Sequence, residues 1–202
     1  MAAYPFSVMG VYKMNISVNA GFTEDMLKTL SLMKGKTLKS ICGVFFHSLY
    51  ESFDDVRLVL GQFAIDVSCN SHVEPLISYD NKIIYEDVSY FSCAKKRLSE
   101  KYVTSANDKP VSFIVNEHVS EVVLVRDDIN VSNGEHYLVD RAFTIKTSEK
   151  AYTLFRKEII DERIYISISD KIEGFQSIKE VKDSWDGEGR YSVDIDRKFL
   201  FL

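Results

Sequence analysis

The sequence contains few of the residues that interrupt regular secondary structure and few cysteines that could cross-link a small protein. Its 202 residues include only 9 glycines, 3 prolines and 3 cysteines. So little glycine and proline excludes a collagen-like or low-complexity chain, and a hydrophobic share of 46% excludes a disordered one. We therefore expect a compact globular protein that buries its own core without disulfides.

Metal ligands at recognisable spacing are also lacking. No two of the four histidines are three or four residues apart, and no Cys-x-x-Cys pair occurs. The carboxylates from Asp183 onward do not form a calcium loop, because Trp185 and Gly187 occupy positions that need oxygen ligands. We expect no metal and no cofactor. The cysteines lie among apolar residues and indicate free thiols in a reducing cytoplasm; they are Cys42, Cys69 and Cys93.

Positive charge is in deficit, since the formal net charge is −5. Nucleic acids and anionic membranes attract cationic surfaces, so we expect neither as a partner and consider a basic protein the better candidate. The N-terminus has no positively charged segment, and Lys13 and Asn15 interrupt its first apolar run. No signal peptide or membrane-spanning helix is expected, and the predicted location is the cytoplasm.

The clearest helix signal lies near the N-terminus. Thr23 supplies an N-cap hydroxyl, and Glu24 and Asp25 place acids at the positive end of the helix dipole. Apolar residues follow at helical spacing until Lys34 and Gly35, which are typical of a helix end. The pattern predicts a helix over 24–34.

Short β-rich runs dominate the rest of the first half, and a second helix is predicted within it. The expected strands are 38–46, 56–68, 76–79 and 82–85. A helix is predicted over 88–102, because apolar residues recur there at helical spacing: Val88, Phe91, Ala94, Leu98 and Tyr102. Its basic residues are explained by compensation of the helix dipole, with a binding patch as the alternative.

A linker over 105–110 is predicted to separate the chain into two parts, 1–104 and 111–202, the second packed into the same globule. Strands in the second part are predicted over 111–115, 119–126, 136–139, 143–147, 152–156, 163–169 and 191–196. Asn133-Gly134 indicates a hairpin, because both residues tolerate positive φ. We therefore expect a mainly β (α+β) protein with antiparallel sheets, an N-terminal helix and one mid-chain helix.

Two segments share an apolar spacing that leaves open an internal duplication. Leu58-Val59-x-x-x-Phe63-x-Ile65 recurs as Leu138-Val139-x-x-x-Phe143-x-Ile145. Two diverged copies of a β unit explain the match, and so does the alternation that any two half-buried sheets obey. Under both explanations nine residues are expected to be buried, namely Leu58, Phe63, Ile65, Leu138, Phe143, Ile145, Ile164, Ile166 and Ile168.

Catalytic signatures are lacking as well. The sequence has no Gly-rich phosphate loop and no Gly-x-Ser-x-Gly elbow, so we expect no catalytic residues. The alternative is an enzyme with a dispersed site, a hydrolase or nuclease that uses Asp170, Glu180 and Lys182.

The only tryptophan lies in an acidic segment. Asp183, Trp185, Asp186 and Glu188 are the predicted partner-binding residues, because a large rigid aromatic among repelling carboxylates suits an interface with a basic protein. The alternative is that the indole folds back onto the sheet. A second apolar feature, Phe199-Leu200-Phe201-Leu202, is expected to pack into the core or against another chain, which leaves a homodimer open.

In size, acidity and its acidic aromatic segment 183–189, the sequence resembles bacterial immunity proteins, which neutralise polymorphic or contact-dependent growth-inhibition toxins. The resemblance implies a stoichiometric inhibitor whose partner is a toxin domain. The alternatives are the dispersed-site enzyme and a structural or regulatory module that homodimerises.

Overall fold

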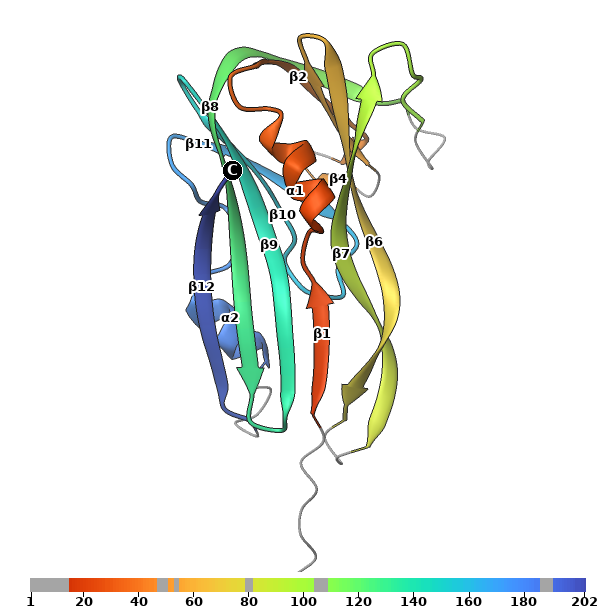
Figure 1. Ribbon diagram of the computed structural model, residues 1–202, viewed down its shortest axis with the longest axis vertical. Helices are drawn as coiled ribbons and strands as arrows, with labels where there is room; N and C mark the ends of the chain where they lie inside the picture. The colour runs from red at the N-terminus through yellow and green to blue at the C-terminus, as the bar shows by residue number, and fades with distance from the viewer. Residues whose placement is uncertain (1–14, 47–50, 53–54, 79–81, 104–108, 186–190) are drawn as a thin grey trace, which may run out of the picture.

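The computed structural model describes residues 15–46, 51–52, 55–78, 82–103, 109–185 and 191–202. Most of them lie in one continuous hydrogen-bonded series of strands (Figure 1). In spatial order these are β3 (Phe45–Phe46), β4 (Glu51–Ser52), β11 (Ile164–Ser169), β10 (Ala151–Phe155), β9 (Glu135–Thr147), β8 (Val111–Val131), β2 (Thr37–Gly43), β5 (Val56–Leu60), β6 (Phe63–Ile77) and β7 (Ile83–Arg97). Neighbours in this series are antiparallel.

Two further strands are attached beside this series. β1 (Ile16–Ala20) pairs in parallel with the first part of β9, and β12 (Val193–Phe201) pairs antiparallel with β8. The two helices are α1 (Glu24–Ser31), which follows β1, and α2 (Ile178–Trp185), which precedes β12. The predicted fold class, mainly β with antiparallel sheets and an N-terminal helix, is confirmed.

Strand β8 connects two sheets because it is long enough to belong to both. Its first residues pair with β2, whereas its second part, from Val119, pairs with β9 and β12. Within the first part, at an irregularity in the pairing with β2, Asn116 has φ 58°, a conformation that asparagine tolerates better than most residues. β8 therefore passes from the sheet that contains β5, β6 and β7 into the sheet that contains β9, β10 and β11.

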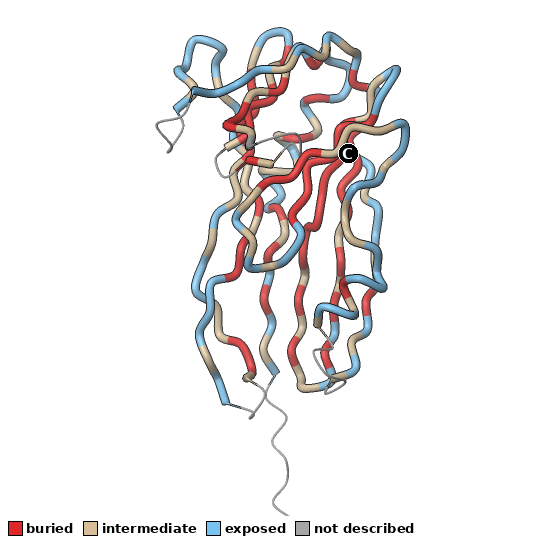
Figure 2. The backbone as a smooth tube through the Cα atoms, turned by 180° about the vertical axis from the view of Figure 1, so that it is seen from behind, coloured by how far each residue is buried: buried red, intermediate tan, exposed pale blue. Residues whose placement is uncertain are grey.

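The main core lies where these two sheets face each other. Phe22, which precedes α1, stacks on Phe91 of β7 with ring centroids 5.8 Å apart. Phe143 of β9 meets both rings edge-on, at 6.0 Å and 6.2 Å. Figure 2 shows buried backbone along the central strands of both sheets. One aromatic cluster thus joins the N-terminal segment to strands of both sheets.

The N-terminal helix begins where the sequence predicts and ends a little earlier. Thr23 caps α1, since its Oγ1 accepts a hydrogen bond from the backbone N–H of Met26 at 3.3 Å. The last helical residue is Ser31, and a turn follows in which Gly35 has φ 74°. That conformation suits glycine and ends the segment as the sequence indicates.

The helix predicted over 88–102 is wrong, because residues 83–97 form strand β7, which pairs with β6 along its whole length. Val88 and Phe91 are both buried, but they contact different clusters on opposite faces of the strand. A strand that is buried on both faces can imitate helical spacing. The second helix is α2, in a segment for which no helix was predicted.

Several short strands predicted in the second half are parts of longer ones. The runs 111–115 and 119–126 are joined in β8, and 136–139 and 143–147 are joined in β9. The hairpin at Asn133-Gly134 connects β8 to β9 as predicted, with Gly134 at φ 105°. Of the linker predicted over 105–110, residues 105–108 lie outside the described residues.

The two segments with matching apolar spacing do not occupy equivalent places. Leu58 lies on β5 and Phe63 on β6, at either side of a tight hairpin. Leu138 and Phe143 lie on the single strand β9. Strand alternation is therefore sufficient to explain the match. Of the nine residues expected in the core, six are buried and three are half-buried, namely Phe63, Leu138 and Ile168.

We expect Phe143→Ala to lower the free energy of unfolding by about 3–5 kcal/mol, because the ring is fully buried and its loss leaves a cavity between two other aromatic rings. Urea denaturation measures the loss. Phe201→Ala is the control: its side chain is 65% exposed, and we expect a change within about 0.5 kcal/mol. Equal effects of the two substitutions would contradict this description of the core.

Candidate functional site

Helix α2 contains two of the residues predicted to bind a partner, Asp183 and Trp185. A capping box defines the start of this helix. The backbone N–H of Ser177 donates to Glu180 Oε2 at 2.7 Å, and the N–H of Glu180 donates to Ser177 Oγ at 3.2 Å. These hydrogen bonds hold the pKa of Glu180 below its ordinary value. The Ser-x-x-Glu spacing was available in the sequence as a helix-start signal.

The predicted partner-binding residues have different environments. Asp183 is exposed on α2, and its Oδ2 lies 3.7 Å from Nζ of Lys179. Trp185 is half-buried and packs edge-on against Tyr137 of β9, with ring centroids 4.4 Å apart. Asp186 and Glu188 lie outside the described residues. The indole thus folds onto the sheet, and contact of these four residues with a partner stays a prediction.

The residues of the alternative dispersed catalytic site have other partners. Asp170 accepts a hydrogen bond from Lys150 Nζ at 2.6 Å, which lowers the pKa of Asp170. Glu180 caps α2, as described above. In the part of the chain that the structure describes, no cluster of three or more histidine, cysteine or acidic side chains could hold a metal ion.

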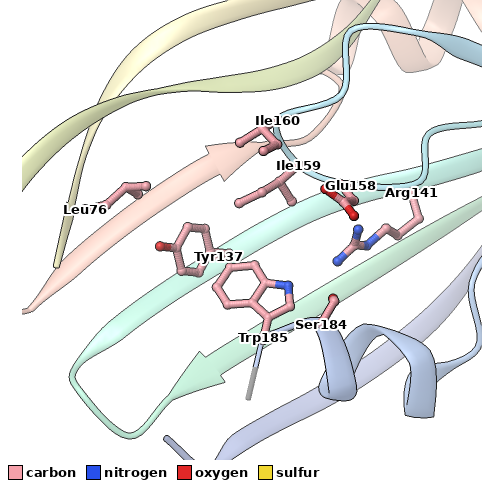
Figure 3. Close-up of a pocket in the computed structure, with 8 residues that line it drawn as sticks. All are labelled: Leu76, Tyr137, Arg141, Glu158, Ile159, Ile160, Ser184 and Trp185. Atoms are coloured by element: carbon pink, nitrogen blue, oxygen red, sulfur yellow. The ribbon is translucent and has the colours of Figure 1, made fainter. Parts of the chain in front are cut away.

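A cavity of about 300 Å³ lies beside Trp185 (Figure 3). Its walls come from β6, β9, α2 and the loop between β10 and β11. The lining residues are Leu76, Tyr137, Arg141, Glu158, Ile159, Ile160, Ser184 and Trp185. Most of this lining is aliphatic or aromatic, with one buried cation and one exposed carboxylate.

A bulge in β9 places Arg141 in this cavity. In the pairing of β9 with β8, Ala142 lies opposite Val125 and Asp140 lies opposite Arg126, so Arg141 is an extra residue in β9. Bulges of this kind redirect a side chain and are common beside binding sites. The bulge also lies where β9 changes its second neighbour from β1 to β10.

The buried carboxylate of Asp127 binds two guanidinium groups. Arg197 of β12 donates from Nε and Nη2 to its two oxygens, at 2.6 Å and 2.8 Å. Arg141 donates from Nε to Oδ2 at 3.2 Å. Arg197 also donates to the backbone carbonyl of Gln176, just before α2. This network fixes Arg141 and links β8, β9 and β12 to the segment that leads into α2.

Arg141 remains incompletely paired. Its residue exposure is 2%, yet Nη2 has no hydrogen-bond partner among the described residues. Burial lowers its pKa from the ordinary value and the nearby Arg197 acts in the same direction, whereas the carboxylates of Asp127 and Glu158 oppose both. Figure 3 shows the guanidinium between the carboxylate of Glu158 and the side chain of Ser184. Arg141 therefore lines the cavity with a guanidinium group that keeps one buried donor unpaired within the described part of the chain.

A neighbouring ion pair holds the segment before α1. Arg126 donates to both oxygens of Asp140, at 2.7 Å and 2.8 Å, and Asp140 is fully buried. Asp140 Oδ2 also accepts a hydrogen bond from the backbone N–H of Phe22. The two charged residues at the β9 bulge thus have separate roles: Asp140 positions the N-terminal segment, and Arg141 reaches the cavity.

The far end of the β6–β7 hairpin has an exposed apolar face, which we call the hairpin face and define as Val73, Pro75, Ile83, Tyr85 and Asp87. Register places Pro75 opposite Tyr85 and Val73 opposite Asp87, so these side chains share one side of the hairpin. Val73 is 64% exposed and Tyr85 is 70% exposed. The signal in the sequence for this surface was that 73–77 and 83–85 are rich in apolar residues on both sides of a polar turn.

The apolar C-terminus is divided between core and solvent. Leu200 and Leu202 pack against the main core, whereas Phe199 and Phe201 are exposed. A homodimer through these two rings stays a prediction.

Comparison with protein-family models, curated proteins and solved structures gave no match to this chain. Among the described helices, none has both the length and the hydrophobicity required to cross a membrane. The cavity and the hairpin face are therefore the features of the molecule that bear on its function.

We expect Asp127→Asn to lower the free energy of unfolding by about 3–5 kcal/mol, because it leaves two buried guanidinium groups without their counterion. Urea denaturation at neutral pH provides the measurement. Asp196→Asn, at a carboxylate 67% exposed on β12, is the matched control and should change stability by less than about 0.5 kcal/mol. A loss below about 1 kcal/mol for Asp127→Asn would show that Asp127 is not essential to the network.

Proposed function

We propose that this protein is a stoichiometric inhibitor that binds a basic protein partner, in the manner of bacterial immunity proteins and their toxins. The observation that carries the proposal is the hairpin face, an exposed apolar surface on an acidic hairpin. An aromatic side chain surrounded by smaller apolar groups is the usual composition of the centre of a protein interface.

Tyr85 is the expected anchor of this interface. Its ring is 70% exposed, so docking would remove a large apolar area from water at the cost of few side-chain rotamers. Val73 and Ile83, at 64% and 49% exposed, extend the apolar area around it. Scattered exposed residues are common, but several on one face of one hairpin favour a binding surface.

The charge of the hairpin favours a basic partner. Residues 70–90 contain four carboxylates and one lysine, a net charge of −3 within a chain whose net charge is −5. Glu86 and Asp87 are exposed, and neither forms an ion pair with another described residue. Such charges speed the encounter with a cationic surface and disfavour anionic ones.

Inhibition by this mechanism needs no chemistry from the inhibitor. The acidic hairpin attracts the partner, and Tyr85 and its apolar neighbours hold it. The inhibitor then covers the substrate site of the partner. The residues predicted from the sequence to bind a partner, two of which lie on α2, are an alternative contact for the same partner, so the test compares both surfaces.

The test uses the tagged full-length chain to isolate a protein encoded next to it, followed by binding kinetics with that purified protein. We expect a complex of one to one with a basic partner. Tyr85→Ala should speed dissociation by about thirtyfold or more. Phe201→Ala is the matched control, since this ring is 65% exposed on β12, and it should leave the rate unchanged.

The combined substitution Glu86→Gln and Asp87→Asn should slow association severalfold at low salt and reduce its salt dependence, because these charges act before contact. Asp183→Asn, on α2, should change neither rate if the hairpin is the interface. Loss of binding only in the Asp183→Asn variant would assign the partner to α2. An acidic partner, or Tyr85→Ala kinetics equal to those of Phe201→Ala, would overturn the proposal.

A further inference from the structure

The cavity beside Trp185 has excess buried positive charge. Asp127 supplies one negative charge to two guanidinium groups, and Arg197 occupies both of its oxygens. Arg141 shares one of these oxygens through Nε, at the longer distance of 3.2 Å. The buried group as a whole is therefore cationic, and Arg141 Nη2 is a buried donor in it without a hydrogen-bond partner among the described residues.

A buried charged donor without a partner is unusual in a native protein. Leaving a buried polar group unsatisfied costs roughly 1–3 kcal/mol, and more when the group is charged. Such groups are therefore rare, and a bound molecule is one of the accepted reasons for them. Arg141 meets this condition, because the residue is 2% exposed, its Nη2 is unpaired among the residues described and its side chain lines a cavity.

We propose that this cavity binds a small monocarboxylate that has an apolar, preferably aromatic, body. The carboxylate accepts hydrogen bonds from the Arg141 guanidinium, and the body lies between the rings of Tyr137 and Trp185 on one side and the aliphatic wall on the other. That wall consists of Leu76, Ile159 and Ile160. The site is separate from the hairpin face, and the inference does not depend on the proposed inhibition.

The charge of the lining favours a monoanion over a dianion. One guanidinium faces the cavity, and the exposed carboxylate of Glu158 lies beside it (Figure 3). A phosphate with two charges would be repelled by Glu158, and it would leave the aromatic and aliphatic walls without contacts. A carboxylate matches a single guanidinium and leaves the rest of the molecule apolar.

The size of the cavity agrees with such a ligand. Its volume of about 300 Å³ is at the lower end of the range for small-molecule sites. Since a water molecule occupies about 30 Å³ in the liquid, the space suits a molecule of about ten non-hydrogen atoms. Phenylacetate has this size and chemistry and is therefore the probe.

Trp185 makes the test direct, because it is the only tryptophan in the chain and lines the cavity. Titration with phenylacetate should change the tryptophan fluorescence saturably, with a dissociation constant of about 1 mM or tighter. Phenylacetamide, which has the same shape without the charge, and acetate, which lacks the apolar body, should each bind at least about tenfold more weakly.

Three variants test the assignment of residues. Arg141→Met should weaken phenylacetate binding at least about tenfold, and Asp127 retains its two bonds to Arg197 in this variant. Glu158→Gln should tighten binding severalfold, because it removes a like charge beside the carboxylate. Lys157→Gln is the control: it removes one positive charge next to Glu158 in sequence, outside the cavity lining, and should have little effect.

Several results would overturn the proposal. One is the absence of both a fluorescence change and thermal stabilisation with phenylacetate up to about ten times the expected dissociation constant. Another is that phenylacetamide or acetate binds as tightly as phenylacetate. The last is that the folded Arg141→Met variant binds phenylacetate as tightly as the unaltered chain. If that variant does not fold, the comparison of phenylacetate with phenylacetamide on the unaltered chain still decides whether the charge is recognised. No partner protein is present in these titrations, so failure here leaves the proposed inhibition untouched.

Discussion

The pairing of the buried Asp127 carboxylate with two arginines is the interaction on which the candidate site depends. It joins adjacent strands through side chains, because Asp127 lies on β8, Arg141 on β9 and Arg197 on β12. Arg197 extends the connection to the backbone at Gln176, just before the helix that carries Trp185. Moving three charges out of water is favourable only when geometry and hydrogen bonding are good. Arg197 meets this condition, because it donates hydrogen bonds to both oxygens of Asp127 and to the carbonyl of Gln176. Arg141 meets it only in part, because its Nη2 has no partner among the described residues.

The incomplete pairing of Arg141 follows from the shape of β9. A regular strand would direct neighbouring residues to opposite faces, but the bulge at Arg141 inserts one residue where β9 changes partner from β1 to β10. Asp140 is then used by Arg126 and the backbone of Phe22, so it is not available to neutralise Arg141. The fold thus fixes one guanidinium beside the exposed carboxylate of Glu158 and leaves its buried Nη2 without a hydrogen-bond partner in the part of the chain that is described. That arrangement distinguishes a prepared anion site from an ordinary buried salt bridge.

Local signals in the sequence predicted much of the fold and little of the site. Thr23 and the hairpin at Asn133-Gly134 act within a few residues, so their effects could be inferred directly. The error at 88–102 arose because Val88 and Phe91 are buried on opposite faces of one strand. Trp185 could be noticed because it is the only tryptophan in the sequence. Arg141 could not, because it lies at an unspecified position in the apolar spacing from Leu138 to Ile145. Its partner Asp127 is 14 residues away, and Arg197 is 70 residues from Asp127, so only the sheet brings them together.

The two candidate sites share strand β6, and the alternation of its side chains keeps them separate. Leu76 lines the cavity, whereas Pro75 and Val73 have the opposite parity and belong to the hairpin face. Because register determines which face each residue occupies, a slip by one residue would bury the hairpin face and expose Leu76. Pairing with β7 along fifteen residues makes such a slip costly. Substitutions at Tyr85 and at Arg141 therefore act on opposite sides of one rigid hairpin, and each can be interpreted without the other.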